Sequence, residues 1–173
     1  GKSYLCLPKS IRLFPSQGKA IDPTRPCIDT SGNYYTETDI FDVHDYVQDA
    51  EVFAQRYGAG TKPIYERFPQ RQHVKPGQPV FVSEYGGIWW SDKDMSGWGY
   101  GERVKSREEF LDRFEKLTST LMENPDHIGL VYTQLTDVEQ EQNGLYTYNR
   151  EAKFPPEIIS KILCRPAAYE KED

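Results

Sequence analysis

The sequence lacks the marks of several large protein classes. Its three cysteines, Cys6, Cys27 and Cys164, are odd in number and widely spaced, which argues against a disulfide framework and a CxxC metal site. No apolar run approaches the roughly 18 residues of a membrane span, and the Lys and Arg residues form no basic run. With a net charge of -6, the chain is a poor candidate for nucleic acid or an anionic membrane surface. We therefore expect no nucleic-acid partner and no membrane association.

Motifs for several common chemistries are also missing. The sequence has no Gly-x-Ser-x-Gly elbow, no P-loop and no GxGxxG, which argues against a self-standing α/β domain of another class, such as a small hydrolase. Asp42, His44 and Asp45 are close in sequence, but neighbouring strand residues point to opposite faces, so we expect no metal. We also expect no cofactor. A cytoplasmic location is slightly favoured, although a signal upstream of residue 1 would not be visible.

Short apolar runs alternate with amphipathic segments along the chain. Ser106 and Glu109 form a capping box, and apolar residues follow them at helical spacing. Strands that alternate with helices predict an α/β fold with parallel strands and right-handed crossovers. The expected strands are 27–30, 39–46, 79–83 and 128–135, and the expected helices are 49–58, 106–124 and 154–163.

Glu84 is the strongest candidate for a functional residue. It follows the apolar run 79–83 and precedes Tyr85-Gly86-Gly87, where the glycines permit a sharp turn and the close approach of a ligand. A carboxylate at the end of a buried strand is costly unless hydrogen bonds or opposite charges compensate it. In parallel sheets the chemistry lies at the carboxyl ends of the strands. From the residues alone, a functional carboxylate and a structural Glu paired with an Arg both remain open.

Residues 81–87, Phe-Val-Ser-Glu-Tyr-Gly-Gly, resemble the nucleophile strand of glycoside hydrolase family 2, the β-galactosidase and β-glucuronidase family. Three further motifs resemble the same family in the same order. Residues 22–32 resemble its fifth strand, residues 42–46 its sixth, and residues 132–145 its eighth strand and exit loop. The similarity as a whole extends over roughly residues 20 to 163.

This resemblance implies a partial (β/α)8 TIM barrel with strands 5 to 8 and their helices. The expected organisation is an unassigned segment over 1–20, the C-terminal half of the catalytic barrel over 21–165, and a charged, frayed tail over 166–173. The resemblance also implies a retaining β-glycosidase that hydrolyses O-glycosidic bonds of a carbohydrate substrate, with Glu84 as nucleophile.

The acid/base of such an enzyme is expected to be missing from this chain. In the family it is the Glu of an Asn-Glu pair that precedes the motif beginning at Asp22, but residues 1–19 contain no Asp or Glu. The alternative is a non-catalytic carbohydrate-binding or scaffold remnant of the same fold. A half barrel would also leave two strand edges open, so we expect self-association or a need for the missing barrel half.

Six further residues are candidates for substrate binding, each with a structural alternative. For His44 and Tyr46 the alternative is a hydrogen-bonded residue at a strand end, and for Trp89 and Trp90 it is packing of the loop. Gln134 and Asp137 are candidates for hydrogen bonds to sugar hydroxyls.

The other residues with polar or aromatic side chains in this region carry weaker expectations. For Trp98, lining the site and packing the loop remain equally open. Glu139 and Glu141 are expected in a solvated loop, and His73 and His127 at the surface.

Overall fold

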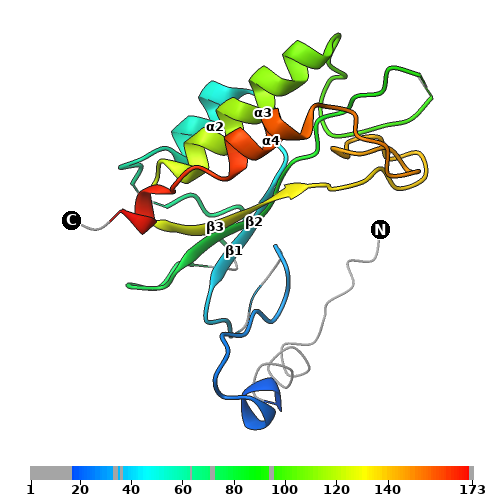
Figure 1. The fold of residues 1–173 in the computed structure, drawn as a ribbon. Coiled ribbons are helices and arrows are strands. Elements are labelled where there is room, and N and C mark those ends of the chain that lie inside the picture. The colour runs from blue at the N-terminus through cyan, green and yellow to red at the C-terminus, as the bar shows by residue number, and fades with distance from the viewer. Residues whose placement is uncertain are drawn as a thin grey trace.

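A parallel three-stranded sheet, in the order β1-β2-β3, forms the centre of the molecule. The computed structural model describes residues 17–32, 35, 37–62, 64–70, 73–93 and 96–171. Figure 1 shows the main helices together on one face of the sheet. In chain order the elements are β1 (Phe41–Asp45), α2 (Ala50–Tyr57), β2 (Val80–Gly86), α3 (Arg107–Met122), β3 (His127–Thr133), α4 (Pro156–Leu163) and the 3-10 helix η1 (Ala168–Glu170).

The predicted α/β class with parallel strands is confirmed. Three of the expected strands and all three expected helices are present, and each strand is followed by a helix on the same face. This arrangement is consistent with part of a TIM-type barrel, in which parallel strands alternate with an outer layer of helices.

The middle strand, β2, is paired along both edges and covered by helices on one face. It pairs with β1 along one edge and with β3 along the other. Val80, Val82 and Tyr85 are buried in the core that the helices form with the sheet. Strands of this kind require a near-continuous apolar run. The polar residues Ser83 and Glu84 therefore stand out near the carboxyl end of β2.

Helix α3 begins where the capping box predicted. The Ser106 Oγ accepts a hydrogen bond from the Glu109 backbone N–H at 3.2 Å. The Glu109 side chain returns a bond to the Lys105 N–H at 2.8 Å, one residue before the position that a standard box uses. The buried face of the helix consists of Phe110, Phe114, Leu117, Thr118, Leu121 and Met122.

The predicted strand over 27–30 is wrong. The Cys27 carbonyl accepts from the Asp39 N–H at 2.9 Å, and the Cys27 N–H donates to the Asp39 Oδ2 at 2.8 Å. These bonds go to the residues just before β1 and not to a neighbouring strand. The segment is therefore a loop in the structure, although its Ile and Cys suit a strand.

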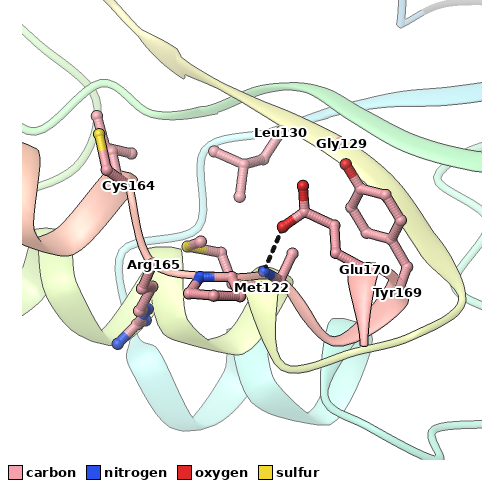
Figure 2. Close-up of a pocket in the computed structure, with 10 residues that line it drawn as sticks. Met122, Gly129, Leu130, Cys164, Arg165, Tyr169 and Glu170 are labelled. Atoms are coloured by element: carbon pink, nitrogen blue, oxygen red, sulfur yellow. Dashed lines mark hydrogen bonds between the residues drawn. The ribbon is translucent and has the colours of Figure 1, made fainter. Parts of the chain in front are cut away.

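The charged end of the chain also differs from the expected frayed tail. Residues 168–170 form η1, and the Ala167 N–H donates to the Glu170 Oε2 at 2.8 Å. This segment lines a cavity of about 560 Å³, to which Gly129 and Leu130 of β3 also contribute. Figure 2 shows Tyr169 and Glu170 among the residues around it. The cavity thus lies at the edge of the sheet and takes none of its lining from β2.

Within the described residues, no helix combines the length and the apolar character that crossing a membrane requires.

His127 is buried, contrary to the expectation of a surface position. As the first residue of β3 it is only 5% exposed, and its ring meets the Tyr57 ring at a centroid distance of 5.9 Å. Its Nδ1 has no hydrogen-bond partner among the described residues. Burial lowers the pKa of His127 to about 4, because the charged imidazolium would lose its hydration.

We expect His127 to make the protein less stable in mild acid. Its folded pKa of about 4 lies below the unfolded value of about 6.5, so the unfolded chain takes up the proton first. This destabilisation is absent above about pH 6.5 and grows as the pH falls toward 4, at up to about 1.4 kcal/mol per pH unit. Urea unfolding of His127→Phe should show a flatter pH dependence over this window than the parent protein.

The control for this experiment is His73→Phe. His73 is an exposed loop residue beside Glu66, so its removal should leave most of the acid dependence in place. Parallel stability profiles for the parent protein and His127→Phe would show that His127 is not the responsible group.

Candidate active site

Glu84 lies at the carboxyl end of the sheet, opposite His44 of β1. The register runs from the pair Val43 and Val82 directly to the pair His44 and Glu84, so Ser83 is an additional residue in β2. Irregularities of this kind redirect the side chains that follow them. The Glu84 side chain is 36% exposed. It is therefore accessible to a ligand, although it stands within a strand.

Two side chains from the end of β1 contact the Glu84 carboxylate. The Tyr46 hydroxyl donates to the Glu84 Oε2. The His44 Nε2 lies 3.5 Å from the Glu84 Oε1 and 2.9 Å from the Ser31 Oγ. The structure thus brings together three residues predicted from the sequence, and it adds Ser31 from the loop before β1.

The protonated hydroxyl of Tyr46 is a hydrogen-bond donor to Glu84. Burial, together with the neighbouring Glu84 carboxylate, raises the pKa of the Tyr46 hydroxyl far above its ordinary value. The hydroxyl therefore keeps its proton at neutral pH. The bond from Tyr46 therefore holds the Glu84 carboxylate in one orientation.

Tyr100 supports Tyr46 from the loop that follows β2. The two rings stack with their centroids 3.6 Å apart and an interplanar angle of 4°. Gly87 makes this possible, because a Cβ at its position would lie 2.4 Å from the Tyr100 ring. Tyr100 is not among the site residues predicted from the sequence. The only signal for it is an aromatic residue between two glycines, Gly99 and Gly101.

The Ser31, His44 and Glu84 cluster is not a Ser-His-Glu catalytic triad. In a triad the serine and the acid bind different ring nitrogens, so that the acid orients the imidazole while the other nitrogen accepts the proton. Here the Ser31 Oγ and the Glu84 Oε1 both lie on Nε2. These contacts therefore do not give Ser31 the geometry of a triad nucleophile.

Asp42 and Asp45 flank His44 on β1 but point away from each other. The Asp42 Oδ2 accepts from the Ser83 Oγ, whereas the Asp45 Oδ2 is bound by Arg56 at 2.7 Å and Tyr57 at 2.8 Å. Among the residues that the structure describes, no group of three or more His, Cys, Asp or Glu side chains has the arrangement of a metal site.

The tryptophans that follow Glu84 have mainly loop contacts. Trp90 is buried, and its backbone N–H donates to the Gln142 carbonyl. The Arg103 guanidinium lies 5.3 Å from the centroid of the Trp90 ring. Trp89 is partly buried, and its Nε1 has no hydrogen-bond partner among the described residues. These contacts favour packing of the loop for Trp90. The assignment of both residues to the substrate remains a prediction.

Gln134 and Asp137 are bound by neighbouring protein groups. The Gln134 Nε2 donates to the Asn143 Oδ1 at 3.0 Å. The Asp137 carboxylate is buried, and its Oδ1 accepts from the Gly144 N–H at 2.8 Å and the Lys153 Nζ at 2.6 Å. These bonds give Asp137 a structural role, and contact of either residue with a sugar remains a prediction.

The α/β fold of this chain resembles part of the fold of solved glycosidase structures. No family model matches the sequence, and no curated protein is significantly similar to it. A β-D-glucuronidase from Dictyoglomus thermophilum matches with a TM-score of 0.63 and 17% identity, over 94% of this chain and 30% of that one.

Two further solved structures show the same likeness. The β-glucuronidase of Bifidobacterium dentium matches with a TM-score of 0.61 and 19% identity, over 93% of this chain and 28% of that one. The agarase AgWH50C matches with a TM-score of 0.56 and 13% identity, over 90% of this chain and 24% of that one. At these identities the likeness shows the fold, and the chain spans less than a third of each of these proteins.

We expect the buried Lys153 to be essential for the loops beside the site. Its Nζ donates to Asp137 and, at 2.8 Å, to the Trp90 carbonyl, so it links three segments of the chain. Lys153→Met should lower the free energy of unfolding by about 3–5 kcal/mol, because it leaves the Asp137 charge buried without its counterion. Denaturant unfolding measures this loss.

The matched control is Lys116→Met on α3. Lys116 also pairs with an aspartate, Asp112, at 2.7 Å, but both side chains are more than half exposed. Its replacement should change the stability by less than about 1 kcal/mol. Similar losses for the two variants would contradict the role given to Lys153.

Proposed function

We propose that this chain is part of a retaining β-glycosidase of the family 2 type, with Glu84 as the nucleophile. The observation that carries the proposal is the Glu84 carboxylate, accessible at the carboxyl end of a buried parallel strand and bound by Tyr46 and His44. The glycoside hydrolase-like fold and the motifs over 22–32, 42–46, 81–87 and 132–145 support it.

In the proposed reaction, Glu84 attacks the anomeric carbon of a β-glycoside. A bond forms between a Glu84 oxygen and that carbon while the glycosidic C–O bond breaks, and a second carboxyl group protonates the departing oxygen. Water then attacks the glycosyl–Glu84 ester, and the second carboxylate removes the proton of that water. The sugar is released with its original anomeric configuration.

Tyr46 fits this reaction because its hydroxyl can donate a hydrogen bond to Glu84 in each step. Its bond to the Glu84 Oε2 leaves the other oxygen, Oε1, on the side of His44. A single fixed orientation of the nucleophile lowers the entropy cost of reaching the attacking geometry. His44 is proposed as the second orienting contact.

The acid/base of this reaction is proposed to be missing from this chain. Retaining enzymes place their two carboxyl groups about 5–5.5 Å apart. Asp42 lies near the site, where it is bonded to Ser83. It is fully buried and bonded to neighbouring protein groups, so we do not propose it as the acid/base. We propose residues 21–165 as the C-terminal half of the barrel, with the acid/base supplied by the other half.

The test of Glu84 is covalent labelling with an activated 2-fluoroglycoside. We expect the ester to form on Glu84 when the chain is combined with the upstream half of a related barrel, and to be absent with the chain alone. Peptide mass spectrometry of the product locates the label. Glu84→Gln should abolish labelling, whereas Glu139→Gln, at an exposed loop position, should not.

Labelling of another residue in the combined protein would refute the nucleophile assignment. Hydrolysis of nitrophenyl β-glycosides by the chain alone, lost in Glu84→Ala, would instead place an acid/base within this chain or a second copy of it. Weak sugar binding that survives Glu84→Gln, without any labelling, would favour the alternative of a non-catalytic carbohydrate-binding remnant.

We also expect the isolated chain to self-associate. In the described sheet, β3 pairs only with β2, and unpaired strand edges promote association. Ile128 and Val131 of β3, and Leu135 just beyond it, are exposed apolar side chains. Light scattering should show oligomers, and Val131→Lys should reduce them. A monodisperse monomer of the parent chain over a range of concentrations would overturn this expectation.

A further inference from the structure

Asp42 occupies an unusual position beneath the candidate site. It is 0% exposed, yet among the described residues no Lys or Arg side chain forms an ion pair with it. Its Oδ2 accepts two hydrogen bonds of 2.7 Å, one from the Gly32 backbone N–H and one from the Ser83 Oγ. Its Oδ1 is buried and has no hydrogen-bond partner in the described structure. A buried carboxylate with only neutral donors costs stability, so its presence calls for a reason.

The first bond fixes the turn that covers His44. Gly32 has a φ of +57°, and a Cβ at its position would lie 2.0 Å from the His44 Cδ2. The backbone of this turn therefore lies directly against the imidazole ring. Ser31, the preceding residue, places its Oγ 2.9 Å from the His44 Nε2. Asp42 is thus bonded to the turn that packs on the His44 ring.

The second bond fixes the residue before Glu84. Ser83 is the additional residue of β2, at the irregularity that sets Glu84 opposite His44. Its hydroxyl donates to the same Asp42 oxygen that holds Gly32. One carboxylate oxygen therefore connects the turn on one side of the His44–Glu84 contact to the strand on the other side.

We infer that Asp42 is a positioning residue that sets the His44 imidazole against the Glu84 carboxylate. It acts through the Ser31–Gly32 turn and through Ser83, and it does not contact Glu84 in the described geometry. The effect of Asp42 on the reactivity of Glu84 rests on the proposed function. The geometric part concerns His44 and is measurable without any catalysis.

Nuclear magnetic resonance of the histidine rings gives a direct readout on this chain. The sequence has only three histidines, His44, His73 and His127, so their ring signals can be assigned by substitution. We expect a nuclear Overhauser effect between the His44 ring and the Gly32 α-protons. We also expect Glu84→Gln to shift the His44 Nε2 resonance, because the two groups are 3.5 Å apart.

Asp42→Ala and Asp42→Asn separate positioning from general stability. Asn has an oxygen that can accept both bonds, so Asp42→Asn should retain the Gly32 contact and the response of His44 to Glu84→Gln. Asp42→Ala should lose the contact and reduce the response at least about twofold. Loss of both signals in Asp42→Asn as well, or their retention in Asp42→Ala, would overturn the inference.

The control is Asp45→Asn, a buried acid of the same strand that binds Arg56 and Tyr57 on the opposite face. It should leave the His44 signals in place. If Asp42→Ala does not fold, Ser83→Ala removes one of the two bonds with a smaller change. It should still reduce the response of His44 to Glu84→Gln, and an unchanged response there would refute the role of Asp42.

Labelling in the combined protein then separates the two proposals. If Glu84 is the nucleophile, Asp42→Ala should slow labelling at least about tenfold, since a misplacement of about 1 Å can cost a hundredfold in rate. Asp42→Asn should retain most of the labelling rate. If Asp42→Ala changes the His44 signals but Glu84 of the parent protein is not labelled, the proposed function is rejected and the geometric inference is kept.

Discussion

The parallel pairing of β1 with β2 is the constraint on which the candidate site depends. It sets His44 opposite Glu84 and carries Tyr46, just past the end of β1, to the same carboxylate. A shift of this register by one residue would turn Glu84 toward the helices and Tyr85 toward the site. The core prevents the shift, because Tyr85 is fully buried beside Phe53 and bonds to Thr118. Packing on one face of the sheet thereby determines the chemistry on the other.

The three buried aspartates, Asp42, Asp45 and Asp137, differ in the groups that bind them. Asp45 and Asp137 are buried with a cation, Arg56 and Lys153, which is the usual way to offset the cost of desolvation. Asp42 has neutral donors instead, and these donors lie on both sides of the His44–Glu84 contact. The contrast suggests that stability alone does not account for Asp42. On the other side of β2, β3 has a free edge in the described structure, and this strand carries exposed apolar side chains and contributes to the lining of a cavity.

Features with a strong local signal were predictable from the sequence. The apolar run before Glu84 became β2, and the capping box at Ser106 became the start of α3, because each depends on residues close together in the chain. The strand over 27–30 was predicted wrongly, since a strand needs a partner and the backbone of Cys27 bonds to Asp39 instead. His127 was misplaced for a related reason: a short polar sequence before a strand does not reveal that Tyr57 of α2 packs on it.

The sequence by itself determined the α/β alternation and the placement of Glu84 at a strand end. It also placed His44 and Tyr46 at the end of another strand, and the carboxyl ends of parallel strands lie at one edge of a sheet. Only the tertiary structure decided that Ser31, Asp42 and Tyr100 belong to the same cluster and that Lys153 binds Asp137. These contacts join loops to strands across long stretches of chain. Such contacts follow no period in the sequence, because they arise only when the packed core brings the loops together.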